Sequence, residues 1–261
     1  MKDNRRVVYY EDALNDEFSG TKIKRIPLGK YEYAPKGFLY DLVSGFVYWV
    51  IAYPLLWLVS KIGYRVKTLG KRNRKMLRGQ GVFIYGNHTQ IIDAFTAQLF
   101  ACRGKRTYIV CNQDTTSIKG VRWLVKMLGA IPTPENPTEA EGYKACIAKR
   151  IRQRRGIAIF PEAHIWPYST HIRPFGDESF TFPAELGAPV MAMACTYRRR
   201  KFFKNRSPRM TLHLSKPFYP NMKLSLPERR RQLRNAVYDF LLEKAAEEEN
   251  YEFIRYVKKK K

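Results

Sequence analysis

Acidic side chains are scarce in this sequence. Asp and Glu number 23 against 48 Lys and Arg, which gives a formal net charge of +25 over 261 residues. This excess says nothing about the fold, but it implies a polyanionic partner, either nucleic acid or anionic lipid headgroups. The length is enough to bury a full core as one α/β domain with an appendage.

Cysteine and histidine are also few, at four residues each, and neither type is clustered. The cysteines show no C-x-x-C spacing, which favours reduced thiols in a protein that faces the cytosol. His164 and His171 form the only near pair of histidines, and no cysteine joins them. We therefore expect neither a metal site nor a bound cofactor.

Two further patterns are missing. Residues 1–18 mix charges where a secretory signal needs an apolar segment, so we expect no such signal at the start of the chain. The chain also has no G-x-S-x-G run. A serine acyl-enzyme of the α/β-hydrolase type is therefore not supported.

One long apolar run is present at residues 42–60, which are 19 residues without a charge. That is just long enough to cross a bilayer as a helix. Pro54 interrupts the run, and basic residues flank both ends, so the positive-inside rule gives no orientation. Trp49, Tyr53 and Trp57 recur every four residues, on one helix face. The pattern favours a helix, or a helical pair broken near Pro54, that enters one leaflet without crossing. A buried core helix and a true span are the alternatives.

From residue 81 onward, short apolar runs alternate with longer periodic segments, which predicts an α/β fold with a mainly parallel sheet flanked by helices. Strands are predicted at residues 82–85, 107–111, 130–132, 157–160, 189–195 and 210–215. Helices are predicted at residues 91–101, 117–128, 138–154 and 227–248. Thr138 and Glu141 read as a capping box, and Pro227 suits a first helical turn.

This pattern divides the chain into three parts. We expect a polar, irregular N-terminal arm (1–37), a hydrophobic membrane-associating segment with basic flanks (38–75) and an α/β domain (76–261).

The chemistry centres on residues 81–95, GVFIYGNHTQIIDAF, where an apolar strand ends at Gly86 and a helical pattern follows. His88 and Asp93 are five residues apart, a rotation of roughly 140° on a continuous helix. They meet only if His88 lies in the turn before the helix. A carboxylate beside an imidazole fixes its tautomer and supports it as a general base. The alternative is a capping or surface histidine without a catalytic role.

Four motifs, in this order, resemble those of the glycerolipid acyltransferases, the lysophosphatidic acid acyltransferase family. The matches are N-H-x-x-x-x-D at Asn87, His88 and Asp93, a helix followed by G-x-I at 117–132, I-F-P-E at 159–162, and an apolar strand around a proline at 187–193. Together they cover about residues 82–218, roughly half of the chain.

The resemblance implies that His88 is the catalytic base and Asp93 its partner. It also implies that Pro161 and Glu162 belong to the acceptor site. Thr89 and Gln90 are substrate-binding candidates because of their adjacency to His88, as is Asn87.

The chain departs from the family after Glu162. The expected Gly-Thr-Arg is replaced by Ala163-His164-Ile165, so the arginine that holds the acceptor's phosphate is missing there. Arg173 precedes a Pro-Phe pair and is a candidate for a bidentate phosphate contact from a shifted position. His164 instead suits an acceptor pocket that binds no phosphate. These departures do not change the predicted reaction, acyl transfer to a hydroxyl, but they leave the identity of the acceptor undetermined.

The sequence therefore predicts a membrane-associated O-acyltransferase of phospholipid biosynthesis, with its active domain facing the cytoplasm. It moves a fatty acyl group from acyl-CoA or acyl carrier protein to a hydroxyl of 1-acyl-glycerol-3-phosphate or a related lysolipid. Anionic membrane lipids are expected partners, and nucleic acid is not, because the basic residues are scattered and no recognition fold appears. The alternatives are a non-phosphate alcohol acceptor and a non-catalytic basic protein that binds lipid or nucleic acid.

Overall fold

The fold is described by a computed structural model that covers residues 6–18, 31–117, 122–202 and 206–259. The strands are β1 (Arg6–Tyr10), β2 (Lys67–Leu69), β3 (Val82–Gly86), β4 (Thr107–Cys111), β5 (Ala130–Pro132), β6 (Gly156–Ile159), β7 (Val190–Arg198), β8 (Arg209–Leu214) and β9 (Ile254–Lys258). The α-helices are α1 (Phe38–Phe46), α2 (Tyr53–Ile62), α3 (Asp93–Thr96), α4 (Gln113–Thr116), α5 (Arg122–Met127), α6 (Pro137–Arg152), α7 (Thr181–Leu186) and α8 (Leu226–Ala245). Shorter helical turns are η1 (Val47–Ala52), η2 (Lys71–Leu77), η3 (Ala97–Ala101) and η4 (Glu178–Phe180).

A seven-stranded sheet forms the centre, in the order β2-β8-β7-β3-β6-β4-β5. Its neighbouring strands are parallel except for the antiparallel pair β7–β8. The predicted α/β class, with a mainly parallel sheet flanked by helices, is confirmed. A separate two-stranded parallel sheet joins β1 to β9.

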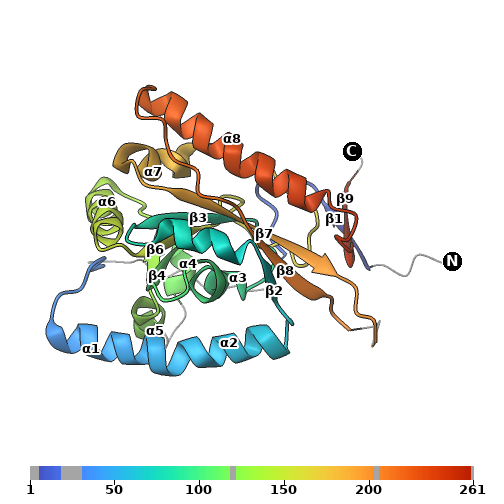
Figure 1. The fold of residues 1–261 in the computed structure, drawn as a ribbon, viewed down its shortest axis with the longest axis horizontal. Coiled ribbons are helices and arrows are strands. Elements are labelled where there is room, and N and C mark those ends of the chain that lie inside the picture. The colour runs from blue at the N-terminus through green and yellow to red at the C-terminus, as the bar shows by residue number, and fades with distance from the viewer. Residues whose placement is uncertain (1–5, 19–30, 118–121, 203–205, 260–261) are drawn as a thin grey trace.

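Each face of the central sheet has its own apolar core, because successive side chains of a strand point to opposite faces. On β3, Val82 and Ile84 pack in the core beneath α2 and η3. Phe83 and Tyr85 pack in the other core, against residues of α6, α7 and α8. Figure 1 shows α7 and α8 on one side of the sheet and α1 and α2 along the opposite edge of the molecule.

The apolar run forms one continuous helix, Phe38–Ile62, of 25 residues with a mean hydropathy of 1.9. Its middle turn, η1, is a π-helix that ends just before Pro54. Proline lacks the N–H that an α-helix needs at this point, and a wider turn accommodates that loss. Only 17% of its most apolar stretch is buried, so the alternative of a buried core helix is wrong.

A stripe of small or polar residues attaches this helix to the domain. Ser44, Tyr48 and Ser60 are fully buried. The Tyr48 hydroxyl accepts a hydrogen bond from the Thr107 backbone N–H over 2.9 Å, and Ser44 donates to the Met127 carbonyl over 3.1 Å. The helix therefore lies on the domain along one face and leaves its apolar face uncovered.

Some predicted helix boundaries are wrong. The helix predicted at 91–101 begins only at Asp93, and the one predicted at 117–128 appears as α5, with residues 118–121 outside the described part. The capping box assigned to Thr138 and Glu141 is also wrong. Asn136 caps α6 instead, its side chain accepting from the Glu139 N–H over 2.9 Å. Both Asn136 and Thr138 are good capping residues, but Pro137 fits the first helical turn only if Asn136 is the N-cap.

The N-terminal arm is not irregular throughout, contrary to the prediction. Arg6 to Tyr10 pair in parallel with Ile254 to Lys258. Residues 19–30 of the arm, with several of its basic side chains, lie outside the described residues. The described part of the arm also packs on the domain through aromatic side chains, with Phe18 against Trp166 and Tyr33 against Tyr143.

Candidate active site

The turn after β3 is fixed to its neighbour strand β7. A Cβ on Gly86 would lie 2.9 Å from the Met193 carbonyl oxygen, so only glycine fits this close approach. The Asn87 amide then donates to the Cys195 carbonyl over 3.0 Å and accepts from the Cys195 N–H over 2.7 Å. Asn87 is 2% exposed. These bonds give Asn87 a structural position, holding the residue before His88 in place.

His88 lies in this turn, and the helix begins only at Asp93, as the five-residue spacing requires. The imidazole Nδ1 is 3.5 Å from Asp93 Oδ2. That is the outer limit of a hydrogen bond, and such contacts commonly shorten when substrate binds. Asp93 Oδ2 also accepts the backbone N–H groups of Thr89 and Gln90, each over 2.7 Å. The same carboxylate oxygen of Asp93 therefore fixes the turn through two backbone N–H groups and faces the imidazole ring of His88.

The His88 ring is fixed on a second side. It stacks on Phe160, with ring centroids 4.5 Å apart and planes 22° apart. Its side chain is 14% exposed, whereas that of Asp93 is 2% exposed. With Nδ1 facing Asp93, the opposite nitrogen Nε2 is the one left for a substrate. Thr89 is fully buried and accepts the Tyr197 hydroxyl over 2.7 Å, which further anchors the turn.

Glu162 follows the carboxyl end of β6 and lies next to His88. It is 5% exposed, and its carboxylate accepts the His88 N–H over 3.2 Å. It also accepts the Arg173 N–H over 3.0 Å and the Arg173 guanidinium over 3.1 Å. Burial raises the pKa of Glu162, while Arg173 and the backbone N–H groups act in the opposite direction.

Arg173 is the partner in this buried ion pair. It is 3% exposed, and its guanidinium also donates to the His164 carbonyl and lies 4.9 Å from the Trp166 ring. Burial lowers its pKa, and Glu162 opposes that effect. Glu162 and the His164 carbonyl take up the Arg173 Nη2 group, whereas Nε and Nη1 are buried and have no hydrogen-bond partner within the described residues. The ion pair with Glu162 was not expected from the sequence, and the predicted contact of Arg173 with an acceptor phosphate stays a prediction.

The loop between Pro161 and Arg173 takes a strained path. Ala163 and Tyr168 have positive φ angles of 63° and 58°. Ala163 stands where the family motif has glycine, the residue that adopts this conformation without cost. His164, the other acceptor-site candidate, has its Nδ1 3.7 Å from a Glu17 carboxylate oxygen and is partly exposed. It therefore lies beside the N-terminal arm.

Trp166 supports this loop and was missed by the sequence reasoning. Its backbone N–H donates to the His88 carbonyl over 3.1 Å, its indole N–H donates to the Asp16 carbonyl over 2.8 Å, and the residue is 2% exposed. The ring packs against Tyr10 near the N-terminus and Tyr256 near the C-terminus, with both centroids 4.8 Å away. The sequence signals this role only through a tryptophan four residues after Glu162. The sheet β1–β9 is therefore the outer support of the turn that carries His88.

Among the described residues, no three His, Cys, Asp or Glu side chains gather in a group that holds a metal ion. Whether the reaction needs a metal or cofactor therefore stays a prediction from the sequence.

An α/β sheet with a His–Asp pair and a buried carboxylate at the carboxyl ends of its strands is the arrangement of an enzyme site. A family model described as Acyltransferase matches residues 65–196. This chain belongs to the acyltransferase family and is an acyltransferase, so the resemblance carried by its motifs is confirmed. The fold is similar to that of the 1-acyl-sn-glycerophosphate (LPA) acyltransferase PlsC from Thermotoga maritima, with a TM-score of 0.57. The two chains share 15% identity over 80% of this chain and 89% of that chain.

Proposed function

We propose that this acyltransferase transfers a fatty acyl group from a thioester of coenzyme A or acyl carrier protein to a hydroxyl of a lysophospholipid, as a step of phospholipid biosynthesis. The observation that carries the proposal is the His88–Asp93 pair, 3.5 Å apart in a turn fixed on both sides, in a chain of this family. The structurally similar PlsC from Thermotoga maritima is an acyltransferase for such a lysolipid, 1-acyl-sn-glycerophosphate.

In the proposed reaction His88 removes the proton of the acceptor hydroxyl as it attacks the thioester carbonyl. The new ester C–O bond forms, the C–S bond breaks, and the imidazolium returns the proton to the leaving thiolate. Asp93 stabilises the imidazolium through Nδ1. Glu162 holds the His88 N–H and hence the position of the turn. Thr89, Gln90 and Pro161 remain acceptor-side candidates by their place in the chain beside His88 and Glu162, and His164 remains one from the sequence alone.

A non-phosphate alcohol is the second candidate acceptor. One observation favours it: Arg173, the predicted phosphate-binding residue, is 3% exposed and donates a hydrogen bond to Glu162.

Purified protein with labelled acyl-CoA and acyl carrier protein tests both acceptors. We expect ester formation with lysophosphatidate, and a monoacylglycerol of the same chain serves as the matched acceptor without phosphate. Faster transfer to the monoacylglycerol supports the second candidate. Transfer to neither lipid by either donor contradicts the proposal.

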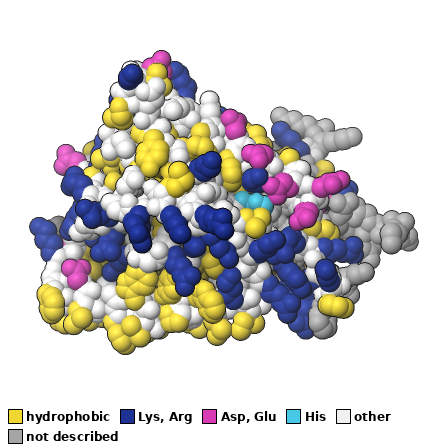
Figure 2. All heavy atoms as spheres, in the orientation of Figure 1, with side chains coloured by type: hydrophobic (Ala, Val, Ile, Leu, Met, Phe, Trp, Pro, Cys, Tyr) yellow, Lys and Arg dark blue, Asp and Glu magenta, His cyan; other side chains and the backbone are white. Residues whose placement is uncertain are grey.

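The membrane-associating segment 38–75 is proposed to dock the enzyme on one leaflet, with the acyltransferase domain on the cytoplasmic side. The outer face of α1, η1 and α2 is apolar and open. Its most exposed members are Phe38 (84%), Leu39 (71%), Ile62 (66%), Leu42 (57%), Val50 (57%) and Leu55 (57%). Figure 2 shows hydrophobic side chains along this edge and a band of Lys and Arg directly above them. An apolar face with basic residues beside it fits a helix lying in an anionic interface.

Replacing Leu42 and Val50 with aspartate is expected to weaken vesicle binding by more than about tenfold per substitution. Each change removes the burial of a large apolar side chain, worth about 1.5 kcal/mol or more. Co-sedimentation with liposomes at low and high salt measures the effect, and wild-type binding should persist at high salt.

Leu14→Asp is the matched control for docking, because Leu14 is 54% exposed on the arm, away from the helix. Equal losses in the control and the helix variant, or no loss in either, would contradict docking through this face.

A further inference from the structure

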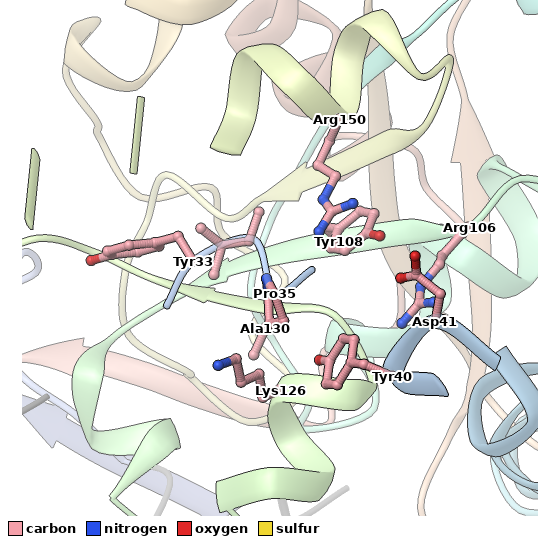
Figure 3. A pocket seen from close by; sticks show the side chains of 10 residues that line it. Tyr33, Pro35, Tyr40, Asp41, Arg106, Tyr108, Lys126, Ala130 and Arg150 are labelled. Atoms are coloured by element: carbon pink, nitrogen blue, oxygen red, sulfur yellow. The ribbon is translucent and has the colours of Figure 1, made fainter. Parts of the chain in front are cut away.

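A small pocket lies where the first turns of α1 meet the β4–β5 edge of the sheet (Figure 3). Its polar lining is Tyr33, Tyr40, Asp41, Arg106, Tyr108, Lys126 and Arg150. Its free volume is about 20 Å³, which holds about one water-sized group. None of the site candidates around His88 lines it. The pocket is therefore separate from the acyl-transfer site and too small for an acyl chain.

Three cations converge on this pocket. The guanidinium groups of Arg106 and Arg150 lie 5.5 and 4.4 Å from the centre of the same Tyr108 ring. Figure 3 shows Arg150 against this ring, with Arg106 beside Asp41 and Lys126 on the opposite wall. The Lys126 side chain is 24% exposed, and burial lowers its pKa.

The acidic groups facing these cations are few. Asp41 is the one carboxylate in the pocket lining, and the Glu32 carboxylate lies 4.0 Å from Lys126 Nζ. Like charges held together in a partly desolvated recess repel one another. An anion at the mouth of the pocket relieves that repulsion.

Several donors at the pocket are unused. The Nε groups of Arg106 and Arg150 and the Tyr33 hydroxyl are buried and have no hydrogen-bond partner within the described part of the chain. A buried donor without an acceptor costs about 1–3 kcal/mol. Guanidinium and ammonium donors match phosphate oxygens in charge and geometry. The donor set therefore points to a phosphate oxygen as the missing acceptor.

The pocket opens beside the apolar face of α1. Asp41 precedes Leu42 and follows the exposed pair Phe38 and Leu39 on the same helix. If that face enters the acyl region, the pocket beside the first turn of α1 comes close to the membrane surface, where the lipid phosphates are. We propose that it binds the phosphate group of an anionic glycerophospholipid of the docked leaflet. One or two phosphate oxygens enter the recess, and the rest of the lipid stays in the bilayer. This inference rests on the proposed docking of residues 38–75.

The test compares two pairs of substitutions that each remove two positive charges. The pocket pair is Lys126→Gln with Arg150→Gln, and the control pair is Lys71→Gln with Lys75→Gln, on the exposed surface of η2. Binding is measured by co-sedimentation on phosphatidylcholine vesicles that carry either phosphatidylglycerol or oleate, at matched surface charge. Circular dichroism and the thermal midpoint verify that each variant folds.

The pocket pair is expected to weaken binding to phosphatidylglycerol vesicles about tenfold more than the control pair does, because charge-assisted hydrogen bonds are lost. On oleate vesicles, which share the charge but offer a carboxylate, both pairs should lose equally. Equal losses of the two pairs on phosphatidylglycerol overturn the pocket proposal and leave docking intact. If wild-type protein fails to bind any vesicle, docking itself fails.

A further arm uses inorganic phosphate without vesicles. Suppose that phosphate raises the thermal midpoint of the wild-type protein and not that of the pocket pair, and that binding is the same on both vesicle types. The pocket then binds free phosphate, and the lipid headgroup is overturned as its ligand.

Discussion

Replacing His88 with alanine is expected to lower kcat for acyl transfer by about 10²–10⁴-fold, the range over which a positioned general base contributes. The ring is partly exposed, at 14%, and faces Asp93 over 3.5 Å, so its removal deletes both the base and the group that Asp93 orients. Release of free coenzyme A, followed with a thiol reagent, measures the loss. The thermal midpoint should change little because Asp93 still holds the Thr89 and Gln90 N–H groups.

The matched control is His171→Ala. The His171 side chain is 65% exposed and pairs with Glu252 over 3.7 Å, away from the catalytic turn. It should keep wild-type kcat. If the His88→Ala enzyme keeps more than about a tenth of wild-type kcat, the loss is too small for a missing general base, and the assignment of His88 fails.

Glu162→Gln is expected to lower the free energy of unfolding by about 3–5 kcal/mol, because it leaves the Arg173 charge buried without its partner. The Arg173 side chain is 4% exposed, so water cannot replace the carboxylate. The same change weakens the acceptor of the His88 N–H, so kcat should fall as well. Urea unfolding gives the stability, and a loss of this size should lower the thermal midpoint by roughly 10 °C.

The double variant Glu162→Gln with Arg173→Met separates a buried ion pair from simple misfolding. Removing both charges should recover part of the lost stability, since no uncompensated charge then remains. If the double variant is as unstable as the sum of the two single variants, the two side chains do not act as a pair. A single-variant loss below about 1 kcal/mol also contradicts the buried pair.

The geometry around His88 was predictable because it is local. The strand, the turn and the helix lie within residues 82–96, and the spacing of His88 and Asp93 allows contact in only one arrangement. The six strands β3 to β8 followed from hydrophobic periodicity for the same reason, whereas the short elements β2, α4 and α7 were not predicted. These features depend on neighbours in the chain.

The partner of Arg173 was not predictable because it depends on the path of a loop. Positive φ angles at Ala163 and Tyr168 turn the chain so that the guanidinium meets Glu162 and the His164 carbonyl. Neither alanine nor tyrosine predicts a positive φ angle, because both residue types adopt it rarely. The pairing of β1 with β9 was hidden too, since it joins Arg6 to Ile254 across almost the whole chain and each strand has only five residues.

That pairing has a consequence for how the protein is made. Synthesis runs from the N-terminus, so β1 leaves the ribosome before the strands of the central sheet and stays unpaired until β9 follows. Ile254 and Tyr256, which pack with Trp166, emerge only after α8. The packing of Trp166 between Tyr10 and Tyr256, which supports the catalytic turn, is therefore completed only after the central sheet has been synthesised.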